Sequence, residues 1–414
     1  MSNLVEMGKK AKSAAVVLAT LPTPVKNKAL LASADALMAA KDEILAKNKE
    51  DVDAALANGI KGAFIDRLTL TEARVADMAD GLRQVAKLDD PVGEVLSMKK
   101  LDNGLVVGQK RVPMGVIGII FEARPNVTAD AAALCIKSGN ACILRSGKEA
   151  HKSSMAITKV LRSAISECGL PEDSIALVQD TSRESAVALM RLNDYLDVII
   201  PRGGAGLIRA VVENATVPAI ETGTGNCHIY IDQTADLDMA KDIVINAKTS
   251  RPSVCNAAEK LLVHKSVAEK ALAEILPALV EKGVTIIGDS ETCRIYPDVI
   301  PATDTDWSTE YLDLKIGVKI VDSIGDAISH INKYNSGHSE AIITDSYENS
   351  QKFLAEVDAA AVYVNASTRF TDGFEFGFGA EIGISTQKLH ARGPMGLKAL
   401  TTTKYIIRGN GQTR

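Results

Sequence analysis

Residues 246–264, Asn-Ala-Lys-Thr-Ser-Arg-Pro-Ser-Val-Cys-Asn-Ala-Ala-Glu-Lys-Leu-Leu-Val-His, join a predicted helix to a predicted strand. A helical pattern over residues 237–248 ends at Arg251-Pro252, and the apolar run 261–263 predicts the strand. Cys255 therefore lies on a connection, where functional side chains are common. A free cysteine is more often a small buried apolar residue. Arg251 is near in sequence, however, and could stabilise the nucleophilic thiolate.

Composition and charge describe an ordinary globular protein with more than one domain. The 414 residues are 46% hydrophobic and 24% charged, and the net charge is −5. Because the chain has no basic block, we expect no nucleic-acid partner. The longest strongly apolar stretch, residues 112–121, is too short to span a bilayer, and the N-terminus carries no signal-peptide apolar region. We therefore expect a cytoplasmic protein without a membrane partner.

The cysteines and histidines indicate no metal site. The six cysteines form no Cys-x-x-Cys pair and match no zinc spacing, and the six histidines form no His-x-x-x-His site. Cys135 and Cys142 lie in apolar patterns and are expected in the core. Disulfides are not expected in a reducing compartment.

The chain begins with a helical part and contains two separate strand-like ribbons. Residues 1–90 show helical periodicity and predict a layer of helices. Residues 95–98 and 105–107 flank the hairpin signal Asp102-Asn103-Gly104, and residues 404–408 form another strand pattern. Exposed ribbons of this kind invite pairing with each other or with another subunit. We predict an oligomerisation element here, and hence a homo-oligomer, either a dimer or a tetramer.

Residues 115–220 alternate strand and helix patterns with short connections. The predicted strands are 116–121, 141–145, 174–178, 195–200 and 217–220, and the predicted helices are 127–138, 151–168, 182–192 and 205–214. Continuous apolar strands between amphipathic helices favour a parallel sheet covered on both faces, which is a doubly wound α/β fold. Such sheets bind ligands beyond the carboxyl ends of their strands.

A second α/β block is predicted from residue 236 onward. Beyond residue 264 its helix and strand patterns cover 266–281, 284–288, 318–321, 324–334, 341–344 and 362–365. Residues 289–312 are polar and are predicted to be irregular. The glycine-rich tail 370–396 predicts a loop that lies close to something else.

Two loops at the predicted strand ends suit a nucleotide. Pro201-Arg202-Gly203-Gly204-Ala205-Gly206 opens a helix, whose N-terminus favours a phosphate. It is also compatible with an ordinary turn, since neither Gly-x-Gly-x-x-Gly nor a Walker A motif is present. Arg145-Ser146-Gly147-Lys148 carries two cations around a turn, which suits the 2′-phosphate of NADPH, although a solvated basic loop would look the same.

Four further polar residues each allow more than one interpretation. Arg124 can bind a carboxylate or phosphate bidentately, and Asn126 can donate to an oxyanion or cap a helix. Glu221 could be a general base, a helix-dipole partner or an ordinary loop carboxylate. His330, taken alone, is more often a surface or capping histidine than a catalyst.

The order of these motifs resembles the aldehyde dehydrogenase superfamily. The matching features are an Arg-Pro-Asn loop after the first strand, a polar turn at Arg145, a glycine turn at Gly203, Glu221-Thr-Gly and Arg251-Pro-Ser-Val-Cys255. The resemblance covers essentially the whole chain. It implies a doubly wound Rossmann-type NADPH-binding domain (1–98 and 112–223), an α/β catalytic domain (224–399) and a small β oligomerisation element (99–111 and 400–414).

Longer motifs narrow the resemblance to one branch of the superfamily. They are Phe-Glu-Ala-Arg-Pro-Asn-Val-Thr at 121–128, Ile-Leu-Arg-Ser-Gly-Lys-Glu at 143–149, residues 246–256, and the string Val-Asp-Ser-Ile-Gly-Asp-Ala-Ile-Ser-His-Ile-Asn-Lys-Tyr-Asn-Ser-Gly-His-Ser-Glu-Ala-Ile at 321–342. They are similar to enzymes of proline biosynthesis that reduce L-glutamyl 5-phosphate with NADPH and release L-glutamate 5-semialdehyde and phosphate. Glutamate 5-kinase would be a candidate partner, and no metal is needed.

The resemblance gives the candidate residues roles. Cys255 matches the nucleophile, whose thiolate would form a thioester with the acyl group, and Asn126 is the second catalytic candidate. Substrate-binding candidates are Arg124, Glu221 and Ser253. Cofactor-binding candidates are Arg145, Ser146, Gly147, Lys148, Gly203, Gly204 and Glu310, the last resembling the glutamate that holds the nicotinamide ribose.

The chain departs from the superfamily pattern at the oxyanion donor. The asparagine that usually donates to the oxyanion aligns with Ala123. The remaining candidate donors are Asn126 and the Cys255 backbone N–H. Glu221 aligns with the base that activates water, but water would hydrolyse the thioester, so we expect a substrate or structural role. The alternatives are a hydrolytic NAD(P)-dependent aldehyde dehydrogenase, with Glu221 as base, and a non-enzymatic nucleotide-binding or thiol-sensing protein.

Overall fold

The computed structural model describes residues 2–414, and its long strands gather into two parallel sheets and one antiparallel sheet. The chain divides into two units. Unit 1 comprises Met1–Thr222, Gly377–Gly383 and Met395–Arg414, and unit 2 comprises Gly223–Phe376 and Ile384–Pro394. The predicted α/β class is confirmed in both units, whereas the predicted domain boundaries stay predictions.

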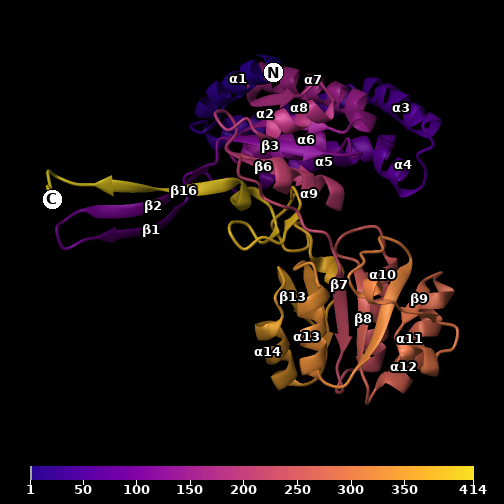
Figure 1. Cartoon of the computed structure of the whole chain (residues 1–414). Coiled ribbons are helices and arrows are strands. Elements are labelled where there is room, and N and C mark those ends of the chain that lie inside the picture. Colours follow the sequence, from indigo (N-terminus) through magenta and orange to yellow (C-terminus); the bar gives the residue numbers. More distant parts are fainter. Residues whose placement is uncertain (1) are drawn as a thin grey trace. The chain divides into compact units, whose positions relative to one another are not determined.

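The helical layer predicted for residues 1–90 is present in unit 1 (Figure 1). It consists of α1 (Ser2–Leu18), α2 (Thr23–Ala39), α3 (Lys41–Ala57), α4 (Ala63–Leu68) and α5 (Glu72–Lys87). Helix α2 packs on α5 and on α7 (His151–Glu167). At the start of α5 the Thr71 hydroxyl accepts the Arg74 N–H, which satisfies one of the donors that a helix start leaves open.

The sheet of unit 1 is four-stranded and parallel, in the order β5-β4-β3-β6. Its elements are β3 (Val116–Phe121), α6 (Val127–Lys137), β4 (Ala141–Ser146), η1 (Lys148–Ala150), α7, η2 (Glu172–Ser174), β5 (Ile175–Leu177), α8 (Arg183–Met190), β6 (Val198–Arg202) and α9 (Ala205–Asn214). Every residue of the central strand β3 is buried, as expected for a sheet covered on both faces. Cys135 and Cys142 lie in this core, as predicted.

The predicted strand 217–220 is wrong. The segment makes one isolated parallel bridge, Ile199 to Ala219. The Ile199 N–H donates to the Pro218 carbonyl at 2.8 Å, and the Ile220 N–H donates to the Ile199 carbonyl at 2.9 Å. Pro218 has no N–H and cannot extend the ladder, so an apolar run that reads as a strand stays a single bridge.

The two predicted ribbons pair with each other and form a three-stranded antiparallel sheet. It contains β1 (Val95–Lys100), β2 (Val106–Pro113) and β16 (Thr401–Arg408), which follows η5 (Leu397–Leu400). Strand β16 runs along β2 from Thr401 opposite Pro113 to Arg408 opposite Val106. In Figure 1 these strands extend away from the helices of unit 1, and all of β1 is exposed. Gly104 makes the hairpin turn with a φ of +87°, which suits glycine.

Unit 2 contains a seven-stranded parallel sheet in the order β10-β9-β11-β8-β7-β12-β13. Its elements are β7 (Cys227–Ile231), α10 (Leu237–Thr249), β8 (Ala258–His264), α11 (Ala268–Glu281), β9 (Thr285–Gly288), α12 (Ser290–Ile295), β10 (Ile300–Pro301), η3 (Asp304–Trp307), β11 (Lys315–Val321), α13 (Ile324–Tyr334), β12 (Ser339–Ile343), α14 (Tyr347–Glu356), β13 (Ala361–Val364), η4 (Thr368–Phe370), and the short pair β14 (Ile384–Ser385) and β15 (Gly393–Pro394).

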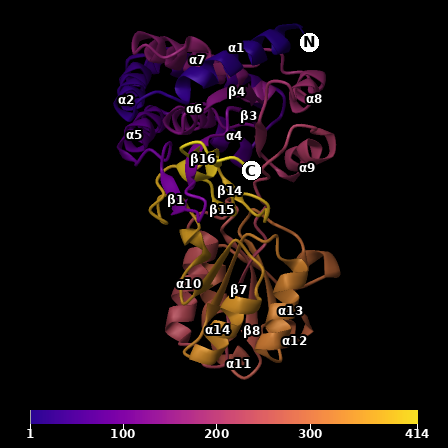
Figure 2. The same ribbon diagram turned by 90° about the vertical axis from the view of Figure 1, so that its left-hand side faces the viewer.

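Helices cover both faces of this sheet (Figure 2). Ile229 and Leu261 point into one apolar cluster, which includes residues of α10 and α11. Tyr230 and Leu262, one position further along the same strands, point into a second cluster with α13 and α14. The alternation follows from the two-residue period of a strand.

Two sequence interpretations in unit 2 need correction. Residues 289–312, predicted to be irregular, contain α12, β10 and η3, and Asp289 caps α12 by accepting the Thr292 N–H. His330 is 9% exposed and packs against Trp307 and Tyr334, so it is neither a surface nor a capping histidine. It lies on the buried side of α13, which explains its burial. Strand β7 and helix α14 were not expected from the sequence.

Candidate functional site

The candidate residues are distributed over both units. Cys255, Ser253 and Glu310 belong to unit 2. The remaining candidates belong to unit 1, and they are Arg124, Asn126, Arg145, Ser146, Gly147, Lys148, Gly203, Gly204 and Glu221. The two groups are therefore described one after the other.

Cys255 lies in the turn between α10 and β8, as the sequence predicted, and is partly exposed together with Ser253. Its carbonyl oxygen accepts the Cys227 thiol at 3.2 Å. Gly225 packs directly on the Cys255 backbone, because a Cβ at position 225 would lie 1.4 Å from the Cys255 carbonyl oxygen. The backbone of the candidate nucleophile is therefore held from one side by the segment that leads into β7.

Arg369, which the sequence did not single out, holds the other side of this turn. Its Nε donates to the Ser250 hydroxyl at 3.0 Å, and its Nη1 donates to the Asn256 amide oxygen. The Asn256 amide in turn donates to the Arg369 and Thr371 carbonyls at 3.1 and 3.0 Å. These contacts fix both ends of the Cys255 turn.

Arg369 also contributes charge to the site. Burial lowers the pKa of Arg369, the nearby Arg251 lowers it further, and interaction with Cys255 acts in the opposite direction. A cation that interacts with Cys255 favours the thiolate. The sequence had pointed to Arg251 for this role, but its side chain is exposed. No motif signals Arg369, because it lies more than a hundred residues from Cys255 in the chain.

Glu310 contacts Gly225, the residue that packs on the Cys255 backbone. Its Oε1 accepts the Gly225 N–H at 2.6 Å. The carboxylate therefore lies beside the segment that packs on the Cys255 carbonyl. A ribose hydroxyl is a donor that such a carboxylate can accept.

In unit 1, three loops leave neighbouring strands at the carboxyl edge of the sheet. Strand β3 lies between β4 and β6, so the loops after Phe121, Ser146 and Arg202 are adjacent. The Gly147 N–H donates to the Phe121 carbonyl at 2.7 Å, which ties the β4 loop to β3. The Gly204 N–H at the start of α9 donates to the Glu122 carboxylate at 2.9 Å.

The glycine turn and the β4 loop fit a dinucleotide. A Cβ at Gly203 would lie 2.6 Å from the Glu122 carboxylate, so a side chain at position 203 would displace the Glu122 side chain. The helix that follows offers the N-terminus that a phosphate prefers. Lys148 is 75% exposed on its side chain and can reach an anionic group at this edge.

Arg145 is placed differently from Lys148. Its guanidinium donates to the Thr181 and Ser182 carbonyls at 2.7 and 3.0 Å, and burial lowers its pKa. Arg145 thus fastens the β5–α8 loop to β4. Ser146 lies 3.3 Å from the His151 ring and is buried. Of the two cations in the motif, the exposed one is Lys148.

Asn126 does not cap α6 with its side chain. Its Nδ2 donates instead to the Asp130 carboxylate at 3.0 Å. Burial raises the pKa of Asp130 to about 6, while Asn126 and Arg202 act in the opposite direction. Arg124 is half-buried in the same loop, and Glu221 is half-buried at the carboxyl side of the Ala219 bridge.

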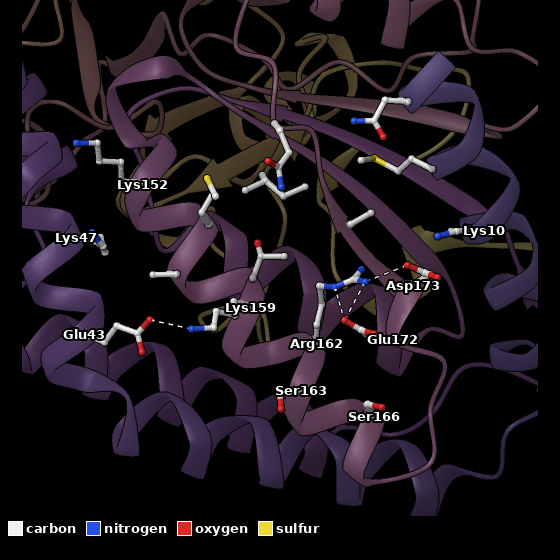
Figure 3. A pocket seen from close by; sticks show the side chains of 18 of the residues that line it. Lys10, Glu43, Lys47, Lys152, Lys159, Arg162, Ser163, Ser166, Glu172 and Asp173 are labelled. Atoms are coloured by element: carbon white, nitrogen blue, oxygen red, sulfur yellow. Dashed lines mark hydrogen bonds and ion pairs between the residues drawn. The ribbon is translucent and has the colours of Figure 1, made fainter. Parts of the chain in front are cut away.

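The described residues contain no group of histidine, cysteine, aspartate or glutamate side chains arranged to hold a metal ion. Among the helices of residues 2–414, none is long and apolar enough to cross a membrane. A surface pocket of about 1000 Å³ lies in unit 1 between α1, α3, α7 and β5 (Figure 3). Ion pairs such as Lys159–Glu43 (3.3 Å) and Arg162–Asp173 (3.0 Å) line it, and its lining includes none of the candidate residues.

Known proteins similar to this chain share both its sequence and its fold. The model of the aldehyde dehydrogenase family matches residues 2–292. A gamma-glutamyl phosphate reductase of Clostridium botulinum (strain Eklund 17B / Type B) is 63% identical over 414 residues, which is all of both chains. The corresponding enzyme of Caldicellulosiruptor bescii is 62% identical over 418 residues, again all of both chains.

Solved structures agree with these sequence matches. A crystal structure of gamma-glutamyl phosphate reductase from Thermotoga maritima is 50% identical, covers 99% of each chain and superimposes with a TM-score of 0.97. An acetylating aldehyde dehydrogenase from Geobacillus thermoglucosidasius is 18% identical, covers 100% of this chain and 98% of its own, and has a TM-score of 0.73. The second match shows a common fold.

Proposed function

The chain belongs to the aldehyde dehydrogenase family and, within it, to the gamma-glutamyl phosphate reductases, and we propose that it reduces L-glutamyl 5-phosphate to L-glutamate 5-semialdehyde with NADPH. The observation that carries the proposal is the full-length identity of 63% to a reductase of this name. It fits the resemblance that the sequence motifs indicated. The reaction would serve proline biosynthesis.

In the proposed reaction the Cys255 thiolate attacks the acyl carbon of the substrate. A carbon–sulfur bond forms, the bond from carbon to the phosphate oxygen breaks, and inorganic phosphate leaves with the electron pair. The product on the enzyme is a thioester. The contacts of Arg369 with Ser250 and Asn256 support this role of Cys255, because they hold a cation beside a partly exposed thiol.

NADPH supplies, when bound, the hydride that reduces the thioester carbonyl. Gly203, Gly204 and Lys148 would hold its phosphates, and Glu310 would accept a hydrogen bond from the nicotinamide ribose. The resulting thiohemiacetal then collapses, expels the Cys255 thiolate and releases the aldehyde. No water is required, so Glu221 needs no role as a base.

Two donors are candidates for stabilising the oxyanion. The first is the backbone N–H of Cys255, whose carbonyl is fixed by Cys227 and Gly225. The second is the Asn126 amide, which has two hydrogens and gives one of them to Asp130. Arg124, Ser253 and Glu221 would bind the charged and polar groups of the substrate.

We also propose that the β1-β2-β16 sheet joins copies of the chain. It exposes apolar side chains, among them Met98 (50%), Tyr405 (67%) and Ile407 (57%). An exposed apolar ribbon with open edges favours association. Size-exclusion chromatography with light scattering would show an oligomer, and Ile407→Lys would shift it toward smaller species. A wild-type monomer would contradict the proposal.

The reverse reaction tests the proposed activity. Glutamate 5-semialdehyde and NADP are supplied to wild type and to Cys255→Ala, and NADPH absorbance is followed with and without inorganic phosphate. We expect phosphate-dependent NADPH formation that the variant lacks. Phosphate-independent oxidation would instead indicate the hydrolytic dehydrogenase and restore Glu221 as base. No turnover in either condition would contradict an enzymatic role.

A further inference from the structure

Glu310 lies on a loop whose backbone is hydrogen-bonded to buried side chains of unit 2. Lys260, on β8, is fully buried, and its ammonium donates to the Thr309 carbonyl at 2.7 Å. The same ammonium donates to the Asn226 amide oxygen at 2.8 Å. The Asn226 amide nitrogen donates to the Trp307 carbonyl at 2.8 Å. The loop is thus fastened on the N-terminal side of Glu310.

Glu259, the neighbour of Lys260 in β8, fastens the loop on the other side. Its carboxylate accepts the Tyr311 N–H at 3.1 Å and the Leu312 N–H at 3.3 Å. Lys248 pairs with this carboxylate at 3.3 Å, and both side chains are fully buried. Leu312 has a φ of +54°, a left-handed conformation that few residues with a side chain adopt. The flanking peptide groups of Glu310 therefore have little freedom.

The contacts close a ring. Lys260 donates to Asn226, and the neighbouring Gly225 donates its N–H to Glu310 at 2.6 Å. Glu310 directly follows Thr309, whose carbonyl accepts a second hydrogen bond from Lys260 and so completes the ring. Gly225 in turn packs on the Cys255 carbonyl. One buried ammonium is thus linked to both the carboxylate at 310 and the backbone beside the candidate nucleophile.

Filling the core does not account for this arrangement. Burial lowers the pKa of Lys260 to about 8, while Glu259 acts in the opposite direction. Burying an ammonium is costly, and an apolar side chain of similar size often stabilises a core as well or better. What an apolar side chain could not do is bind the Thr309 carbonyl and the Asn226 amide simultaneously.

We propose that Lys260 is a positioning residue that, through Asn226 and the Thr309 carbonyl, places the Glu310 carboxylate for the cofactor. The inference rests on the proposed function, because it uses the ribose-binding role of Glu310. It goes beyond that function by assigning a role to a buried cation that touches neither substrate nor cofactor. A merely structural lysine would affect stability and leave cofactor binding unchanged.

The chain offers a matched control in unit 1. Lys137 is also fully buried, and its ammonium donates to the Asn27 amide oxygen at 2.6 Å and the Ala86 carbonyl at 2.9 Å. It therefore has the same kinds of partner as Lys260, with no candidate residue among them. Lys260→Met and Lys137→Met make the same chemical change in two buried sites, and the Lys260→Gln and Lys137→Gln pair serves if either methionine variant fails to fold.

The experiment measures NADPH dissociation constants by fluorescence titration, thermal stability, and emission of Trp307. Trp307 is the single tryptophan of the chain and lies on the loop that carries Glu310, where its carbonyl accepts a hydrogen bond from Asn226. We expect Lys260→Met and Glu310→Gln each to weaken NADPH binding about tenfold, with a double variant no weaker than about tenfold, because both changes break one arrangement. Lys260→Met should also shift the Trp307 emission, and Lys137→Met should change only thermal stability.

The outcomes separate the inference from the proposed function. If Glu310→Gln weakens NADPH binding while Lys260→Met behaves like Lys137→Met, the positioning role of Lys260 is wrong and the role of Glu310 stands. If Glu310→Gln leaves NADPH binding unchanged, the ribose-binding role fails, and the inference fails with it. If the effects of Lys260→Met and Glu310→Gln multiply in the double variant, the two residues act independently, which also overturns the inference.

Discussion

The loops at the sheet edge of unit 1 and the Cys255 turn of unit 2 are held in place by different means. In unit 1, Gly147 and Gly204 fix the loops through contacts with β3 and with Glu122 in the loop after it. In unit 2, side chains from distant parts of the chain, such as the half-buried Arg369 and the buried Lys260, fix the turn and its surroundings. The comparison suggests that the unit 1 loops tolerate side-chain changes, whereas the unit 2 turn depends on particular side chains and close backbone packing.

The largest effect is expected at the backbone contact of unit 2. Gly225→Ala places a Cβ 1.4 Å from the Cys255 carbonyl oxygen, so the turn must move. We expect a loss of stability of about 1–3 kcal/mol and at least about a hundredfold loss of turnover, since small displacements of reacting groups are costly. The measurements are thermal unfolding and the reverse assay.

A matched change in the same unit provides the control. Gly325 lies in α13, and a Cβ there would meet the Ser323 hydroxyl at an ordinary 3.6 Å. Gly325→Ala should be neutral or stabilising by up to about 1 kcal/mol. If Gly225→Ala and Gly325→Ala had the same thermal stability and the same turnover, the packing of Gly225 would not constrain Cys255.

The second effect concerns the pH dependence of unit 2. Burial, together with the nearby charges of Lys319 and Lys260, lowers the pKa of His330 to about 4. Its ordinary pKa is about 6.5, so the unfolded chain binds a proton between about pH 6.5 and 4 that the folded chain does not. Stability should therefore fall as the pH falls through this window.

His330→Phe removes the imidazole that binds this proton and should flatten the pH dependence of the unfolding free energy. Between about pH 7.5 and about pH 5, we expect the variant to lose about 2 kcal/mol less unfolding free energy than wild type. Urea unfolding followed by Trp307 emission measures it, because Trp307 packs 5.4 Å from the His330 ring. An identical pH dependence in both proteins would mean that His330 is not the buried neutral base.

The third effect compares the two cations near Cys255. Arg369→Gln removes a half-buried charge and should slow iodoacetamide alkylation of Cys255 about tenfold near neutral pH, because the thiolate loses an interacting cation. Arg251→Gln should have a smaller effect, since Arg251 is exposed and screened by solvent. Peptide mass spectrometry separates Cys255 from the other cysteines. A larger effect of Arg251→Gln than of Arg369→Gln would favour the original sequence interpretation.

The smallest effect is expected at the exposed cation of unit 1. Lys148→Ala should weaken NADPH binding about two- to fivefold, as for an exposed ion pair, and leave NADH binding nearly unchanged. Fluorescence titration with both cofactors measures the difference. An equal loss for NADPH and NADH would show that Lys148 does not contact the 2′-phosphate.

The sequence predicted much of the fold because short-range patterns report local structure. Apolar periodicity placed β3, β4 and β6, and the connection that carries Cys255. The same patterns failed at 217–220, where Pro218 limits pairing to one bridge. They also missed α12, whose start is marked only by the Asp289 cap within a polar stretch.

The candidate site was less predictable because its supports are long-range. Motifs singled out Cys255 and Glu310, but Arg369, Lys260 and Glu259 contribute through contacts with residues far away in the chain. Arg145 illustrates the same limit: Arg145 and Lys148, the two cations of the motif, look alike in sequence, yet the Arg145 guanidinium donates to backbone carbonyls that no side-chain pattern reveals.

The most direct test of the account is a search for an acyl group on Cys255. Glutamate 5-semialdehyde and NADP are mixed with stoichiometric enzyme without phosphate, the reaction is quenched rapidly, and intact and peptide masses are recorded alongside the NADPH burst. The account predicts about one NADPH per active site and a glutamyl adduct on the Cys255 peptide, which added phosphate removes. Phosphate-dependent turnover without any burst or adduct would contradict the thioester route through Cys255.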